Sequence, residues 1–137
     1  MEKFWYKNYD KGVNPEINFS ELPMTFPDVL RKAVSEYGDK IAVKSDNTQI
    51  TYKEFDRLTS KIAGNLRLFG IDKQEKVCIF LPNCFETVLS FWSVERAGIC
   101  GVMTNPLYSE SELIHQITDS DAKAVITSDT LLAKIKA

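Results

Sequence analysis

The sequence of 137 residues contains one histidine, three cysteines and six glycines, and each scarcity excludes a kind of site. A single histidine, His115, excludes a metal site built from several histidines. The six glycines form neither a G-x-G-x-x-G turn nor a P-loop, so we expect no nucleotide-phosphate site in these residues. The cysteines lack the spacing of metal ligands and lie in or beside apolar stretches. We therefore expect buried, reduced thiols at Cys78, Cys84 and Cys100.

Charge of either sign is not concentrated anywhere, because 17 Lys and Arg residues are interspersed with 19 Asp and Glu residues. Without a basic stripe, neither nucleic acid nor an anionic membrane is expected as the partner. The opening residues, MEKFWYKNYDKG, lack the order of a signal peptide, and no run of about 18 apolar residues occurs. These absences predict a cytoplasmic protein.

The composition that remains, 44% hydrophobic and 26% charged, is typical of one soluble domain. Residues 1–24 have no sustained period but are rich in aromatic side chains. We expect an extended segment there, lying across this domain or across chain outside this sequence. Residues 25–137 are expected to form an α/β subdomain. Their last residues, LLAKIKA, open an amphipathic helix without a Gly or Asn cap, which predicts a fragment truncated at its C-terminus.

Two helices and a hairpin are predicted in the first half of the α/β region. Apolar residues at helical spacing follow Thr25, with Gly38 expected at the C′ position. Ile41–Lys44 and Ile50–Tyr52 bracket the turn-forming Ser45-Asp46-Asn47 and predict a small hairpin. Thr51 and Glu54 form a capping box that opens a long helix ending at Gly70. Its expected apolar arc contains Tyr52, Phe55, Leu58, Ile62, Ala63, Leu66 and Phe69.

Three βα units follow, with apolar strands at 77–81, 100–104 and 123–127. Continuous apolar runs separated by helices predict a parallel sheet that is buried on both faces. With right-handed crossovers, the fold class is α/β, a Rossmann-like, doubly wound parallel sheet flanked by helices, with a small N-terminal hairpin. The expected helix caps are Asn83 with Glu86, Ser109 with Glu112, and Ser128 or Asp129.

The helix predicted from Cys84 to Ala97 carries apolar residues on two sides. Phe85, Val88, Leu89 and Trp92 form one face, whereas Phe91 and Val94 point nearly the opposite way. Such a helix is buried on both sides. We expect Phe91 and Val94 to contact material outside this chain, or another subunit, rather than residues 1–24.

Functional residues in an open α/β sheet lie beyond the carboxyl ends of the strands, yet no catalytic, cofactor-binding or metal residue can be assigned there. His115 is expected to be solvated. Ser128 and Asp129 are interpreted as helix caps, and Cys84 has no base or cation near it in sequence. Asn105 and Tyr108 belong to a loop that either packs on its own side chains or lines a cleft formed with further chain. A phospho-acceptor module is excluded because no acidic cluster follows the first parallel strand.

Several stretches resemble the N-terminal part of the adenylate-forming (AMP-binding) superfamily, and within it bacterial-type long-chain fatty-acid CoA ligases. The residues that carry the resemblance are Lys3–Trp5 with Tyr9–Ile17, Ile50–Phe55, Val77–Asn83, Glu95–Gly98, and Asn105–Gln116. Ile50–Phe55 resembles the first core motif of the superfamily. The stretch from Glu95 to Gln116 resembles the second core motif in its acyl-CoA ligase form.

The resemblance implies the first subdomain of the large lobe of an acyl-CoA synthetase. A parent enzyme of this kind joins a fatty acid to CoA with Mg-ATP through an acyl-adenylate, releasing AMP and pyrophosphate. In the family the phosphate loop and the catalytic groups lie downstream, so the fragment alone is expected to be inactive and to hold no cofactor. Its implied partners are the rest of the polypeptide, a second copy in a possible homodimer, and at most a peripheral contact with the inner face of the membrane. A stand-alone α/β binding or interaction module without catalysis remains the alternative.

Overall fold

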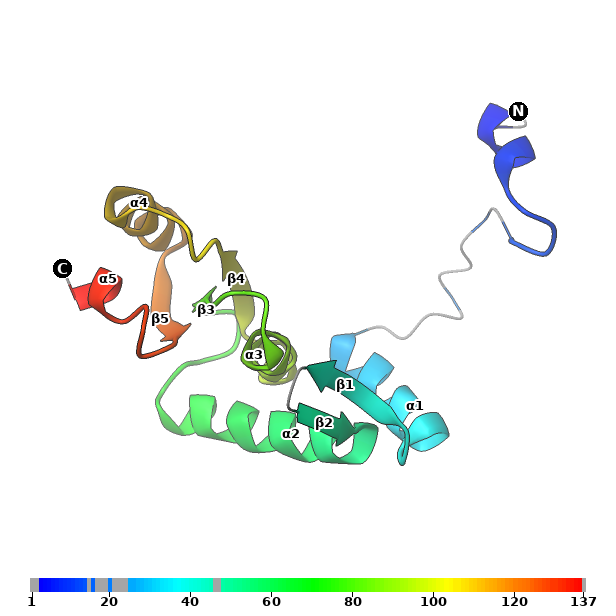
Figure 1. Cartoon of the computed structure of the whole chain (residues 1–137), viewed down its shortest axis with the longest axis horizontal. Coiled ribbons are helices and arrows are strands. Elements are labelled where there is room, and N and C mark those ends of the chain that lie inside the picture. Colours follow the sequence, from blue (N-terminus) through cyan, green and yellow to red (C-terminus); the bar gives the residue numbers. More distant parts are fainter. Residues whose placement is uncertain (1–2, 15, 17–19, 21–24, 46–47, 137) are drawn as a thin grey trace.

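The computed structural model describes residues 3–14, 16, 20, 25–45 and 48–136. A short 3₁₀ helix, η1 (Phe4–Asn8), precedes an α/β body (Figure 1). The elements of that body, in chain order, are α1 (Phe26–Tyr37), β1 (Ile41–Ser45), β2 (Thr48–Thr51), α2 (Tyr52–Leu68), β3 (Lys76–Phe80), α3 (Phe85–Arg96), β4 (Cys100–Thr104), α4 (Glu110–Ser120), β5 (Ala122–Thr127) and α5 (Ala133–Lys136).

The described residues form a parallel three-stranded sheet in the order β4-β3-β5, with β1 and β2 as a separate antiparallel hairpin. Both features of the predicted fold class are confirmed. Because the chain moves from β3 to one neighbour and then crosses over to the other, right-handed connections place α3 and α4 on opposite faces. The two turn residues predicted at 46 and 47 lie outside the described residues.

The core lies around β3, every residue of which after Lys76 is completely or almost completely buried. Val77 and Ile79 join a cluster with Ala63 and Leu66 of α2 and Val94 of α3. Since successive strand residues point to opposite faces, the intervening residues of β3 are buried on the α4 side. The prediction of burial on both faces is wrong for β4 and β5, most of whose residues are half-buried or exposed; among the described residues each pairs with one strand, β3.

Two predicted signals lie around α1 and α2, the capping box at Thr51 and the C′ position at Gly38. Thr25 caps α1, and Thr51 with Glu54 forms the predicted capping box at the start of α2. Gly38, however, does not adopt the left-handed conformation expected of a C′ glycine, because its φ is −45°. Its lack of a side chain matters for another reason: a Cβ there would lie 2.8 Å from the backbone carbonyl oxygen of Val34.

The C-terminus of α2 shows why Phe69 does not belong to the buried arc predicted for it. Gly70 has a φ of +83°, which turns the chain after Phe69. Gly70 donates to the carbonyl of Arg67, and Ile71 donates to that of Leu66, the two hydrogen bonds of a Schellman motif. Ile71 thereby enters the core beside Leu66. Phe69 remains 84% exposed, and the preceding residue, Leu68, is 86% exposed.

Helix α3 is buried on two sides, as predicted, but by residues of this chain. Val94 is completely buried in the core cluster, and Phe91 packs against that cluster. On the other side, the ring of Trp92 lies 5.7 Å from that of Phe26 in α1 and 6.2 Å from that of Phe55 in α2. The expectation that Phe91 and Val94 contact material outside the chain is therefore wrong.

The most buried positions of α3, apart from Val94, are hydroxyl-bearing residues rather than the predicted apolar face: Thr87, Ser90 and Ser93. Their small side chains allow α3 to lie close to α2, and a buried hydroxyl is tolerated when it is hydrogen-bonded. Ser93 donates to the carbonyl of Leu89, and Thr87 donates to that of Pro82. Val88, predicted on the buried face, is 38% exposed.

All three cysteines are free thiols, but only Cys78 is buried. Cys84 is half-buried, and Cys100, at the start of the outer strand β4, is exposed. The prediction of three buried thiols is therefore wrong for these two. None of the described helices combines the length and the apolar character needed to span a membrane.

Candidate functional site at the carboxyl edge of the sheet

The parallel register brings the turns that follow β3, β4 and β5 to one edge of the sheet, as predicted. In open α/β folds, ligands bind beyond this edge. Phe80 pairs with Thr104 on one side and with Thr127 on the other, so the residues after these positions are neighbours. We call these three turns, residues 81–83, 105–106 and 128–129, the carboxyl edge.

The turn after β4 uses its polar groups to hold its own shape. The Asn105 side-chain oxygen accepts from the Leu107 backbone N–H at 3.0 Å, and the Asn105 carbonyl accepts from Tyr108 at 3.1 Å. Ser109 and Glu112 then form the predicted capping box of α4. Leu107 is 85% exposed, so the loop does not pack on its own leucine as one interpretation of the sequence required.

A lysine that sequence reasoning missed connects this turn with the end of the chain. The Lys134 ammonium donates to the carbonyl oxygens of Pro106 at 3.3 Å and Tyr108 at 3.2 Å. These contacts tie the segment after β5 to the turn after β4. Nothing in the local pattern distinguishes Lys134 from an ordinary exposed lysine of an amphipathic helix, because its two acceptors are more than 25 positions away.

The predicted caps after β3 and β5 are both wrong. Cys84 rather than Asn83 is the N-cap of α3, and it makes no side-chain capping bond. After β5, the helix begins only at Ala133, beyond the reach of a cap at Ser128 or Asp129. Instead, the Ser128 carbonyl accepts from the N–H groups of residues 131 and 132, and its hydroxyl lies 2.8 Å from that of Thr130.

Cys84 shares its surroundings with hydroxyl and carboxyl groups rather than with a base. Its sulfur lies 3.3 Å from the Thr87 hydroxyl. The pKa of Glu86 is lowered by hydrogen bonds from its own backbone N–H and from Cys84. These contacts give the sulfur no cationic partner, so they do not identify Cys84 as a reactive nucleophile.

His115 is exposed on α4, as expected. It lines an open depression of about 440 Å³ along the helix, together with Tyr108, Glu112 and Asp119. The Ser109 hydroxyl and backbone N–H lower the pKa of Glu112, which is thus engaged in the helix cap. The depression presents separate solvated side chains on one helix surface.

A second cavity, of about 230 Å³, lies between α1, the hairpin, α2 and α3. Leu30, Val43, Phe55, Val88 and Trp92 are among its mainly apolar lining residues. No residue of the carboxyl edge lines it, and its lining contains no group of acids or bases.

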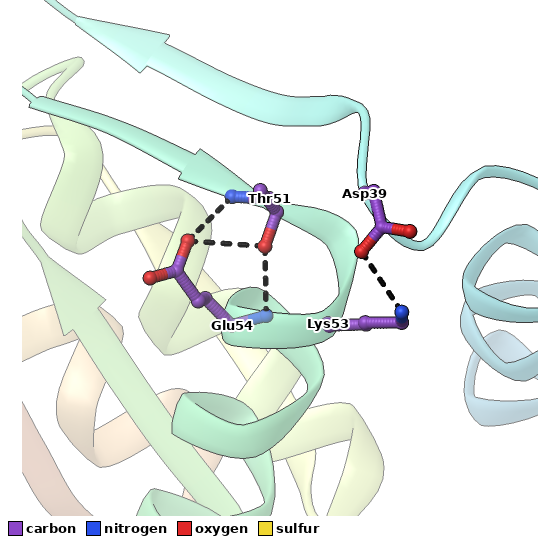
Figure 2. Close-up of polar contacts among 4 residues, drawn as sticks. All are labelled: Asp39, Thr51, Lys53 and Glu54. Carbon is purple, nitrogen blue, oxygen red and sulfur yellow. Dashed lines mark hydrogen bonds and ion pairs between the residues drawn. The ribbon is translucent and has the colours of Figure 1, made fainter.

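A set of polar contacts joins the hairpin to α2 within the stretch that resembles the first core motif (Figure 2). Glu54 accepts from the Thr51 N–H at 2.9 Å and from its hydroxyl at 3.0 Å, and these two bonds lower the pKa of Glu54. Lys53 forms an ion pair with Asp39 at 2.8 Å across the same junction. The backbone N–H of Lys53 donates to the Gly38 carbonyl. These contacts position secondary structure, and they leave no free acid–base pair.

The described residues do not fit a Mg²⁺ or nucleotide-phosphate site. They contain no cluster of three His, Cys, Asp or Glu side chains suited to a metal ion. Next to the carboxyl edge, the hydroxyl of Thr127, the last residue of β5, is buried without a hydrogen-bond partner. The side-chain oxygen of Gln116, on α4, is also buried without one. Two isolated oxygens do not make a coordination shell. No step of a reaction is therefore assigned to the described residues.

Comparison with known proteins shows a clear relationship. The family described as AMP-binding enzyme matches residues 30–137. The chain is 33% identical to a long-chain-fatty-acid–CoA ligase of Bacillus subtilis over 134 residues, which are 97% of this chain and 23% of that protein. It is 31% identical to a 2,3-dihydroxybenzoate-AMP ligase of the same organism over 105 residues, 77% of this chain and 20% of that protein.

The fold agrees with these relationships. The structure of the anthranilate CoA ligase AuaEII in complex with anthranoyl-AMP matches 88% of this chain and 24% of its own, with a TM-score of 0.81 and 21% sequence identity. This likeness concerns the fold alone. The chain spans less than a quarter of the length of the relatives it matches.

Proposed function

We propose, since the chain belongs to the AMP-binding enzyme family, that it is part of an ATP-dependent long-chain fatty-acid CoA ligase. In the proposed reaction, an oxygen of the fatty-acid carboxylate attacks the α-phosphorus of ATP and pyrophosphate leaves. The thiol of CoA then attacks the acyl carbon, forms the thioester and releases AMP, while the thiol proton passes to solvent or a base. ATP and CoA are cytoplasmic metabolites, so the proposal places the enzyme in the cytoplasm or at the inner face of its membrane.

The observation that supports this substrate class is the extent of the similarity. The family match begins at residue 30, whereas the alignment with the long-chain ligase covers 97% of the chain and thus includes most of residues 1–24 as well. The alignment with the dihydroxybenzoate ligase covers 77%. The segment before α1 is therefore shared with a long-chain enzyme in addition to the family core.

The role proposed for this chain is structural. Its strands and helices would form one wall of the large lobe, while the groups that bind phosphate, Mg²⁺ and CoA would come from the remainder of the polypeptide. The turn after β4 supports this role, because the Asn105 side chain holds the turn and Ser109 with Glu112 caps the helix that follows.

The test is ATP–pyrophosphate exchange by the complete polypeptide that contains this sequence, with palmitate, benzoate and 2,3-dihydroxybenzoate as the acids, followed by thioester formation with CoA. We expect exchange and thioester formation with palmitate, and neither with the 137-residue chain alone. Preference for an aromatic acid would replace the fatty-acid proposal. Turnover by the 137-residue chain, or inactivity of the complete protein with every acid, would contradict the structural role.

A further inference from the structure

The N-terminal 3₁₀ helix displays a preformed aromatic surface. The rings of Phe4, Trp5, Tyr6 and Tyr9, which we call the aromatic cluster, contact one another edge to face in sequence order, with centroid distances of 5.0, 6.3 and 6.4 Å. The Lys3 ammonium lies 5.8 Å from the Trp5 ring centroid and 5.5 Å from that of Tyr6. Because these side chains are already ordered by one another, a partner that buries them loses little side-chain entropy.

This surface is not covered by the described part of the chain. Phe4 is 76% exposed, Trp5 43% and Tyr9 46%, and no residue of η1 is buried. Figure 1 shows η1 standing apart from the α/β body. Tyr6 donates a hydrogen bond to Glu16, so this contact too lies within the segment before α1. Exposed aromatic groups of this size are typical of interaction sites.

The comparisons separate this cluster from the family core. It lies before residue 30, where the match to the family begins. The alignment with the Bacillus subtilis long-chain ligase leaves about four residues of this chain unmatched and therefore reaches into the cluster. About three quarters of that ligase has no counterpart in this chain. The cluster thus belongs to a region that this chain shares with the long-chain ligase outside the family core.

We propose that the aromatic cluster docks, within one molecule, into an apolar groove formed by the part of the polypeptide outside these 137 residues. The proposal uses the longer polypeptide of the proposed function, but not its substrate. Residues 1–16 contain three lysines and three acidic residues, so no basic excess favours an anionic bilayer. The 11 steps along the chain from Asn14 to Thr25 span at most about 40 Å, which keeps the cluster close to its own body and favours intramolecular contact.

The test compares the solvent exposure of Trp5 in two proteins, the 137-residue chain and the complete polypeptide. Both are labelled with 5-fluorotryptophan, and the Trp5 resonance is assigned by its loss in Trp5→Phe. Broadening by a dissolved gadolinium chelate measures exposure, with the partly buried Trp92 as the internal reference. We expect Trp5 to broaden more than Trp92 in the short chain. In the complete polypeptide it should broaden no more than Trp92, at every protein concentration and without lipid.

Three results would overturn the proposal. The first is equal exposure of Trp5 in both proteins. The second is protection of Trp5 that disappears on dilution, which indicates contact with a second copy. The third is protection of Trp5 only in the presence of phosphatidylglycerol vesicles, which indicates contact with a membrane. Phe4→Ser in the complete polypeptide should restore broadening of Trp5, whereas the control Val13→Ser, at an exposed position outside the ring contacts, should not. Acid specificity in pyrophosphate exchange is measured separately, so the docking proposal and the fatty-acid proposal can fail independently.

Discussion

Gly64 lies in the middle of α2, and replacing it with alanine should stabilise the protein. The position is exposed, and a Cβ there would meet no atom within 4 Å. Glycine inside a helix costs about 0.8–1 kcal/mol relative to alanine, because it loses more backbone entropy on folding. Gly64→Ala should therefore raise the free energy of unfolding by about 0.8 kcal/mol.

Gly38 provides the matched contrast, because its backbone is also right-handed helical. There a Cβ would lie 2.8 Å from the Val34 carbonyl oxygen and 2.8 Å from a carbon of Lys53. Lys53 can move at the expense of its ion pair with Asp39, but the backbone oxygen cannot move easily. Overpacking costs roughly 1–3 kcal/mol, which exceeds the entropy gained, so Gly38→Ala should lower stability by about 1 kcal/mol.

Urea denaturation of the 137-residue chain, followed by circular dichroism and Trp fluorescence, measures both changes. With an m-value of about 2 kcal/mol/M, each variant should move the midpoint by about 0.5 M, in opposite directions and without a change in m. If Gly38→Ala stabilises the protein as much as Gly64→Ala does, the close approach of Val34 and Lys53 does not constrain the helix end. If Gly64→Ala destabilises it, the outer face of α2 is not free.

Three further predictions concern the same chain. Arg96→Met should lower the free energy of unfolding by about 1–2 kcal/mol in urea denaturation, because it leaves a partly buried Asp56 without its ion-pair partner. Asp56→Ala should lower the free energy of unfolding less in the Arg96→Met protein than in the unaltered protein. Gly70→Ala should lower the free energy of unfolding by about 1 kcal/mol, because a φ of +83° strains any residue with a side chain. The same assay should show this as a lower urea midpoint. Hydrogen bonds from Thr51 lower the pKa of Glu54, so its stabilising contribution is complete above the unfolded pKa and is lost as pH falls through the lower folded pKa. Glu54→Gln should weaken the acid dependence of the denaturation midpoint below about pH 4.5, and an unchanged pH profile would contradict this.

Local signals in the sequence were sufficient for most of the fold. Capping boxes at Thr51 and Ser109 are confirmed because each bond joins residues three positions apart and depends on no distant contact. The parallel sheet is confirmed by the pairing of β3 with β4 and with β5, although only β3 is buried on both faces. Phe69 is exposed against expectation because helical periodicity was extended one residue beyond the end of α2, where Gly70 changes the chain direction.

Tertiary contacts account for the features that sequence reasoning missed. In α3, hydrophobicity alone assigned Val88 to the buried face, but close packing with α2 favours small residues such as Ser93, whose hydroxyl is satisfied within its own helix. At the carboxyl edge, the meeting of three turns followed from parallel topology. The contact of Lys134 with the Pro106 carbonyl could not be foreseen, because it depends on how the segment after β5 returns toward β4.

The outer strands of the sheet show how fold and proposed function are connected. β5 carries Ala124, Val125 and Ile126 in succession, a composition typical of a strand that is covered on both faces, yet all three are only half-buried. β4 has the same character, with Met103 50% exposed. An edge strand with apolar residues on both faces is a site for further pairing unless it is covered. The family match supplies a physical reason for this surface, because the relatives place more than three quarters of their length outside the matched region. Under the function proposed above, the aromatic cluster, the outer strands and the exposed Leu107 would each contact a larger lobe rather than water.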